Sequence, residues 1–176
     1  MNKISAYIII LLAISLVWSC KKDNYDAPSS TLSGRLVYQG AAIELEYDRV
    51  PFQLYQYGFG KIGSIDGTFT PEGSYSALLF DGEYKFVVPI GQGPFKPKEI
   101  AAGKPDSLTI TVSGDQALDI EVEPYYMIRN PQMTIAGGVV TGTFKAEKII
   151  TDATGRNIER VSLYLNKTKF VSGADN

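Results

Sequence analysis

Residues Ser74–Ile90 read SYSALLFDGEYKFVVPI, and their second half alternates with a period of two. After the Asp-Gly pair in the middle, Tyr84 and Phe86 fall on one side of an extended segment and Lys85 on the other. Successive side chains of a strand point to opposite faces, so the stretch predicts a half-buried β-strand. Asp-Gly before such a strand is typical of a tight turn.

The same period extends on both sides of this stretch. It recurs in TLSGRLVYQG (31–40), in PFQLYQYGFG (51–60) and in DSLTITVSGDQALDIEVE (106–123). The last stretch predicts a strand hairpin around Gly114-Asp115, and Asp66-Gly67 predicts a further turn. No stretch after residue 20 shows a helical period. The body is therefore expected to be all-β, most simply a β-sandwich.

Composition excludes several kinds of chemistry. The chain has 176 residues, no histidine, one cysteine and a formal net charge of -2. An internal disulfide, a Cys/His metal site and a histidine-based catalytic triad are excluded. A chain this close to neutral is a poor nucleic-acid binder, because that binding depends on neutralising phosphates.

The first twenty residues are typical of a bacterial signal peptide. Lys3 precedes the apolar run AYIIILLAISLVW, which is shorter than the ~20 residues of a membrane span. The run ends at Ser19-Cys20, which resembles the lipobox of bacterial lipoproteins. We expect a signal peptide over 1–19 and a lipid on Cys20. The alternatives are an ordinary secretory signal or an N-terminal anchor helix.

Residues 20–30 are expected to form the lipidated cysteine and a flexible tether, because KKDNYDAPSS is charged and lacks apolar periodicity. The Lys-Asp pair behind the cysteine resembles the surface-export signal of Bacteroidota lipoproteins. That resemblance implies outer-membrane attachment with display on the cell surface, the periplasmic face being the alternative.

The order of features within residues 31–124 resembles transthyretin-like (prealbumin-like) modules, also found as carboxypeptidase regulatory-like domains. The opening strand, a later D-G-x-F segment and FDGEYKFVV carry this resemblance. Together, NYDAPSSTLSGRLV, LYQYGFG, LFDGEYKFV and GPF resemble the Bacteroidota lipoprotein family called domain of unknown function 3823. The resemblance implies an accessory of SusC/SusD-like polysaccharide uptake at the outer membrane.

Residues 125–176 also show strand patterns, including the alternation of Val161, Leu163 and Leu165 with polar neighbours. They supply about half of the ~100 residues that an immunoglobulin-like sandwich needs. We therefore expect an incomplete second sandwich. The sequence could be a fragment, or this part could pack on the first domain or on a partner.

Carboxylates give no catalytic or metal site in the sequence. Asp119, Glu121 and Glu123 share one face of a single predicted strand, whereas glycosidase carboxylates face each other across a cleft. This row is expected to be a solvated strand face. Three further aspartates lie beside glycines and lack the dense spacing of a Ca²⁺ loop: Asp66, Asp81 and Asp115. No metal, no cofactor and no enzymatic activity are predicted.

Aromatic residues are the candidate ligand contacts. If Phe52 and Leu54 face the core, the side chains of Tyr55, Tyr57 and Phe59 face outward beside glutamines. Exposed planar rings with amide neighbours suit stacking on a sugar or contact with a protein. Packing of the row against a loop or the second domain is the alternative. Phe95, in the loop GQGPFKPKE, is predicted to be a second exposed contact.

Two functional hypotheses follow. The first is a cell-surface lipoprotein that binds glycan through these rings, with Ser107 in Asp106-Ser107-Leu108 resembling a Bacteroidota O-glycosylation acceptor. The second is a structural or protein-interaction module of a surface complex that touches no sugar.

Overall fold

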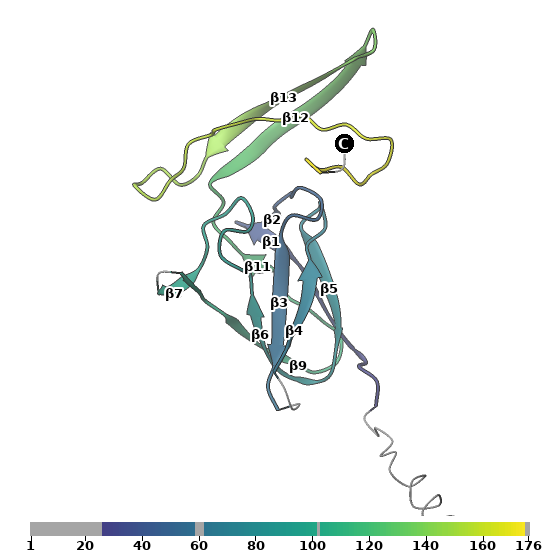
Figure 1. The fold of residues 1–176 in the computed structure, drawn as a ribbon, viewed down its shortest axis with the longest axis vertical. Helices are drawn as coiled ribbons and strands as arrows, with labels where there is room; N and C mark the ends of the chain where they lie inside the picture. Colours follow the sequence, from purple (N-terminus) through teal and green to yellow (C-terminus); the bar gives the residue numbers. More distant parts are fainter. Residues whose placement is uncertain (1–25, 59–61, 102, 175–176) are drawn as a thin grey trace, which may run out of the picture.

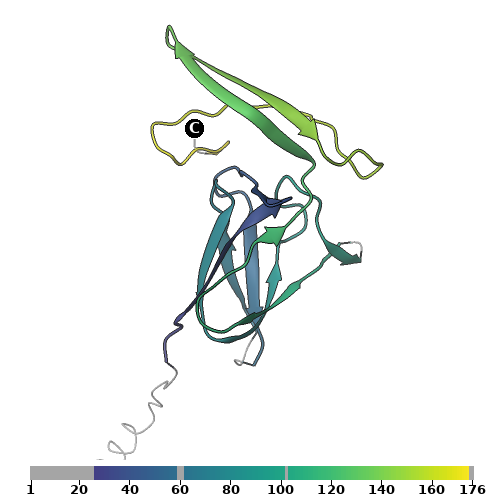
Figure 2. The same cartoon turned by 180° about the vertical axis from the view of Figure 1, so that it is seen from behind.

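The computed structural model describes residues 26–58, 62–101 and 103–174. Two sheets face each other, and a long hairpin stands at one end of them, opposite the end where the chain enters (Figures 1 and 2). The predicted all-β class is confirmed. Within the described residues, no helix has the length and hydropathy that a membrane span requires.

The first sheet is built around β1, its longest strand. Its members are β1 (Ser30–Tyr38), β2 (Ala41–Ala42), β5 (Ser74–Leu79), β10 (Gln116–Ala117) and β11 (Ile120–Glu121). β5 runs antiparallel to β1, from Ser30 opposite Leu79 to Arg35 opposite Ser74. β10 and β11 run parallel to β1. This pairing joins residues 32–37 to residues 116–121, so the paired strands lie far apart in the sequence.

The second sheet has the order β4-β3-β6-β9, and each pair in it is antiparallel. Its strands are β3 (Pro51–Gln56), β4 (Ser64–Thr68), β6 (Gly82–Val87) and β9 (Leu108–Val112). A small antiparallel pair lies outside both sheets: β7 (Glu99–Ala101) and β8 (Lys104–Pro105).

Aromatic rings fill the core between the two sheets. Phe52 stacks on Phe86 with ring centroids 5.1 Å apart, and Tyr75 meets Phe52 edge-on at 5.4 Å. Phe69 lies 5.1 Å from Phe52 and completes the cluster. The predicted burial of Phe52, Leu54, Tyr84 and Phe86 is confirmed, since none of the four is more than 3% exposed.

The predicted turn at Asp66-Gly67 is wrong. Both residues lie inside β4, where Gly67 pairs with Phe52 and Asp66 with Gln53. A Cβ on Gly67 would lie 2.3 Å from the Phe52 ring. This glycine therefore makes room for a cross-strand ring rather than for a turn.

The predicted hairpin over 106–123 is also wrong. Its first half, β9, pairs with β6, while its second half crosses to the other sheet and pairs with β1. The turn at Gly114 is present, with a φ of 70°. It joins two sheets instead of two neighbouring strands, so both apolar rows still face the core.

Residues 126–148 form the long hairpin of β12 (Tyr126–Ala136) and β13 (Val139–Lys148). Met127 and Ile150 at its base are buried, which fixes it to the sandwich. The chain then returns as residues 149–174, in which the described part holds no strand. The strand predicted around Val161–Leu165 is therefore wrong: the segment does not join a ladder, and Val161 is 63% exposed.

The C-terminal part of the returning segment contacts the sandwich. The backbone N–H of Gly173 donates to Glu46 Oε1 at 2.7 Å, and the Phe170 ring lies 5.1 Å from the Tyr47 ring.

Candidate functional site

The outward surface of the four-stranded sheet carries the predicted tyrosines. Alternation along β3 buries Phe52 and Leu54 and leaves Gln53 and Tyr55 facing outward. Register continues this surface across the sheet, with Tyr55 opposite Ser64 of β4 and Lys85 of β6. We call the outward side chains of Gln53, Tyr55, Asp66, Lys85 and Thr109 the tyrosine face.

Hydrogen bonds fix the side chains of the tyrosine face. The Tyr55 hydroxyl donates to Gln53 Oε1 at 3.0 Å, and Gln53 Nε2 donates to Asp66 Oδ1 at 3.1 Å. This relay sets the tilt of the Tyr55 ring and orients the Gln53 amide. It leaves the other Asp66 oxygen available as an acceptor, because a carboxylate accepts through both of its oxygens.

The other half of the tyrosine face is cationic. Lys85 donates from Nζ to the Thr109 hydroxyl, and the same ammonium lies 3.8 Å from Glu83 Oε1. A half-buried ring is thus flanked by a carboxylate on one strand and an ammonium on another. The arrangement offers donors, acceptors and a ring on one flat surface.

The other aromatic residues that were predicted to contact a ligand differ in exposure. Tyr57 follows the last residue of β3 and is 57% exposed, which makes it an accessible ring beside Tyr55. Phe59 and the lipidation candidate Cys20 lie outside the described residues. Phe95 is only 5% exposed, so the prediction that it is an exposed contact is wrong. It bridges to Pro124 and packs into the core.

Ser107, the O-glycosylation candidate, is exposed directly before β9. Its backbone N–H donates to the Asp106 carboxylate at 2.8 Å. Its modification stays a prediction.

Two carboxylates of the predicted row, together with Asp115, have a structural role that the sequence did not predict. Carboxylates of residues 115–121 accept hydrogen bonds from backbone N–H groups of β1 and of Gln39, the residue after β1: Asp115 from Thr31 at 2.7 Å, Asp119 from Arg35 at 2.9 Å, and Glu121 from Gln39 at 2.7 Å. Side chains thus replace ladder partners along this parallel pairing. Among the described residues, no group of three or more acidic or cysteine side chains is placed to hold a metal ion.

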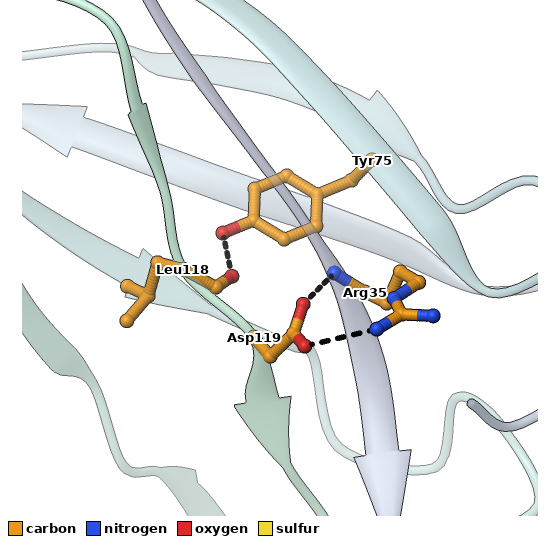
Figure 3. A network of polar contacts seen from close by, with 4 residues as sticks. All are labelled: Arg35, Tyr75, Leu118 and Asp119. Atoms are coloured by element: carbon orange, nitrogen blue, oxygen red, sulfur yellow. Dashed lines mark hydrogen bonds and ion pairs between the residues drawn. The ribbon is translucent and has the colours of Figure 1, made fainter. Parts of the chain in front are cut away.

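Figure 3 shows the centre of that pairing, where Tyr75, Leu118, Asp119 and Arg35 meet. The Tyr75 hydroxyl donates to the Leu118 carbonyl at 2.8 Å. Burial, with a contribution from the Asp119 charge, raises the pKa of Tyr75 to about 12. A Cβ on Gly34 would lie 1.9 Å from the same carbonyl oxygen, so only glycine admits this approach. A glycine inside a predicted strand can indicate such a close backbone approach, and Gly34 is such a glycine.

The fold and this surface define an all-β protein with a two-sheet sandwich and a C-terminal hairpin domain. The family described as "Protein of unknown function (DUF3823) N-terminal domain" matches residues 30–123, and "Domain of unknown function (DUF3823_C)" matches 126–176. The chain belongs to the DUF3823 family. Among curated proteins, nothing matches it significantly.

Solved structures give the same assignment. A DUF3823 family protein from Parabacteroides merdae is 33% identical with a TM-score of 0.67, over 86% of this chain and 72% of that one. One from Bacteroides ovatus is 34% identical with a TM-score of 0.58, over 71% and 60%. A Bacteroides uniformis structure described as a "putative carbohydrate binding protein" is 19% identical with a TM-score of 0.55, over 72% and 56%. The chain spans less than two thirds of the last two.

Proposed function

We propose that the protein is a non-catalytic, glycan-binding accessory of the cell surface, held at the outer membrane by a lipid on Cys20. The observation that carries the proposal is the Tyr55–Gln53–Asp66 relay on an open sheet surface beside the exposed Tyr57. A planar ring stacks on the apolar face of a sugar, while amide and carboxylate groups bind its hydroxyls. The description of the Bacteroides uniformis neighbour agrees with it.

The family context adds a partner to this proposal. SusC/SusD-like outer-membrane proteins would take up the polysaccharide that the accessory captures. The tyrosine face lies on the strands of the sandwich and not on the β12–β13 hairpin (Figure 1).

The test is a glycan array followed by affinity electrophoresis in the retained polysaccharide. Tyr55→Ala and Tyr57→Ala are each expected to weaken retention by about 2- to 12-fold, the equivalent of the 0.5–1.5 kcal/mol of an aromatic contact. Tyr55→Phe keeps the ring and loses the relay, so it separates stacking from hydrogen bonding. Phe170→Ala, which removes a ring 48% exposed on the returning segment, is the control. Equal retention by the parent and both alanine variants would exclude this site.

A second candidate function is a protein-interaction module, and the β12–β13 hairpin favours it. Met133 pairs with Gly142, and Ile135 with Val140, so their side chains share one face. Met133 is 62% exposed and Ile135 78%. Such an apolar sheet face is typical of an interaction surface.

The opposite face of the hairpin supplies the matched control. Thr134 and Thr141 pair there, and Arg129 Nε donates to Glu147 Oε2 at 2.7 Å. In a membrane pull-down, a protein partner lost with Ile135→Asp and kept with Thr134→Asp would support this candidate. Retention of the partner by Ile135→Asp would exclude the apolar face.

The lipid anchor is tested on its own. Metabolic labelling with a fatty acid is expected to mark the parent and to fail with Cys20→Ala. Labelling of Cys20→Ala at the level of the parent would contradict the anchor.

A further inference from the structure

A cavity of about 370 Å³ opens between the edges of the two sheets, and we call it the inter-sheet slot. Its apolar walls come from both sheets and from the 88–98 loop: Phe86, Phe95, Leu108, Leu118 and Val122. The volume falls within the range of small-molecule sites, which are mainly apolar with a few polar groups at set places. No part of the tyrosine face lines it.

Leu108 shows that the slot exposes side chains of core type. Leu108, Ile110 and Val112 share the inward face of β9, and the last two are 5% and 1% exposed. Leu108 itself is 45% exposed although it pairs with the buried Phe86. It is exposed because it opens onto the slot, where the opposite sheet does not cover it. An apolar ligand would cover it.

Backbone hydrogen bonds hold the loop that forms the outer wall. Lys96 N–H donates to the Glu123 carbonyl at 2.8 Å, and Tyr125 N–H to the Pro94 carbonyl at 2.9 Å. The far end of the loop is held by Asp106 N–H, which donates to the Lys98 carbonyl at 2.8 Å. These hydrogen bonds hold the backbone on both sides of Phe95. The outer wall of the slot is therefore formed before any ligand binds.

The charged residues around the slot differ in their contacts with this chain. Three carboxylates each accept a hydrogen bond from a backbone N–H, and Asp119 also pairs with the Arg35 guanidinium: Asp106, Asp119 and Glu121. Lys96 donates to the Thr154 hydroxyl at 3.2 Å. Within residues 26–58, 62–101 and 103–174, the Lys98 ammonium has neither an ion pair nor a hydrogen bond, and Lys98 is exposed at the rim. The rim thus offers an unpaired cation.

We propose that the inter-sheet slot binds an amphipathic anion, a medium-chain alkyl carboxylate. Its chain would lie between the sheets against Phe86, Phe95 and Leu108, and its carboxylate would pair with Lys98. This site is independent of the proposed glycan-binding face, and either can fail without the other.

Titration calorimetry of the full chain with hexanoate, octanoate and octanol tests both halves of the ligand. The affinity is expected to rise about fourfold per added methylene, since each buried methylene contributes about 0.8 kcal/mol. Lys98→Ala is expected to weaken octanoate binding about two- to fivefold and to leave octanol binding unchanged. Lys104→Ala, an exposed lysine that does not line the slot, is the control and should change neither.

A second variant pair tests the position. Leu108→Asp places a carboxylate in the slot and is expected to abolish octanoate binding, while Ile100→Asp, at a site 71% exposed and outside the slot, keeps it. Should Leu108→Asp fail to fold, amide shifts in the parent decide: changes at Phe86, Phe95 and Leu118 support the slot, and changes confined elsewhere overturn it. The proposal is also overturned by absent octanoate binding, by affinity independent of chain length, or by octanoate binding to Lys98→Ala that equals its binding to the parent.

Discussion

The Asp119 carboxylate binds Arg35 twice, once at its backbone and once at its side chain. Oδ1 accepts the Arg35 backbone N–H at 2.9 Å, and Oδ2 lies 3.3 Å from the guanidinium (Figure 3). This contact stands at the break between β10 and β11, where two residues leave the parallel ladder. The Asp119 side chain thus connects residues 116–121 to β1 at the point where the backbone ladder is interrupted.

Asp119→Ala is expected to lower the free energy of unfolding by about 1–2 kcal/mol. The backbone N–H of Arg35 would lose a charged acceptor, although the site is partly exposed and water replaces some of the bond. Urea denaturation measures this change. Glu123→Ala, in the same carboxylate row, should leave the midpoint unchanged, and Asp119→Asn should retain most of the stability. Equal midpoints for Asp119→Ala and Glu123→Ala would contradict the role of Asp119.

Gly34→Ala is expected to cost at least about 2–3 kcal/mol, in the range of overpacked sites with lost hydrogen bonds. Its Cβ would lie 1.9 Å from the Leu118 oxygen and 3.0 Å from the Tyr75 ring, so β1 and residues 116–121 would have to separate. Gly63→Ala is the control, because nothing lies within 4 Å of that Cβ. Similar melting temperatures for the two variants would refute the close approach.

Tyr75→Phe is expected to flatten the alkaline side of the stability curve. Burial raises the pKa of Tyr75 from 10.0 to about 12, so the folded state favours the protonated hydroxyl. This contribution is complete below pH 10 and is lost as the pH rises towards 12. At neutral pH the variant should also lose about 1 kcal/mol with the bond to Leu118.

The measurement for Tyr75 is urea unfolding between pH 7 and pH 12. Tyr57→Phe, at an exposed ring, should keep the alkaline slope of the parent. A Tyr75→Phe curve parallel to that of the parent would be inconsistent with a buried, titrating hydroxyl.

Asp81→Asn is expected to flatten the acid side of the same curve. Asp81 Oδ1 accepts from the Ser30 hydroxyl at 2.5 Å and from the Gly114 N–H at 3.0 Å, and these bonds lower the pKa of Asp81. A lowered pKa gives stability that is present above the unfolded value, about 3.9, and is lost as the pH falls through the folded value. Ser30→Ala removes one of the bonds and should lose part of this acid dependence. Superimposable acid limbs for the parent and Asp81→Asn would disprove the linkage.

Local alternation was enough to predict the strands and the inward rows of β3 and β6. Phe52, Leu54, Tyr84 and Phe86 are buried because each strand has one covered face, and this pattern is written in a few consecutive residues. The same alternation placed Tyr55 outward. The relay through Gln53 and Asp66 required the register of β3 with β4, which alternation does not contain.

Features that depend on distant pairing were not predictable. Residues 116–121 carry the pattern of a hairpin arm, yet their partner is β1 and not β9. Phe95 lies in a Gly/Pro-rich loop, and its burial follows from the bridge to Pro124. In both cases a segment far along the chain supplies the partner, so neither composition nor period indicates it.

The parallel pairing of β1 also sets when the domain can close. Arg35 and Asp119 are separated by 84 positions in the sequence, and β1 has β5 on its antiparallel side and β10–β11 on its parallel side. During synthesis from the N-terminus, β1 therefore cannot be hydrogen-bonded along both edges until the residues near 121 have been made. Non-local closure of this kind is slow, because the loop entropy is lost before the contacts form. Until then β1 presents an open edge, so this protein is most exposed to mispairing early, while it is still being made.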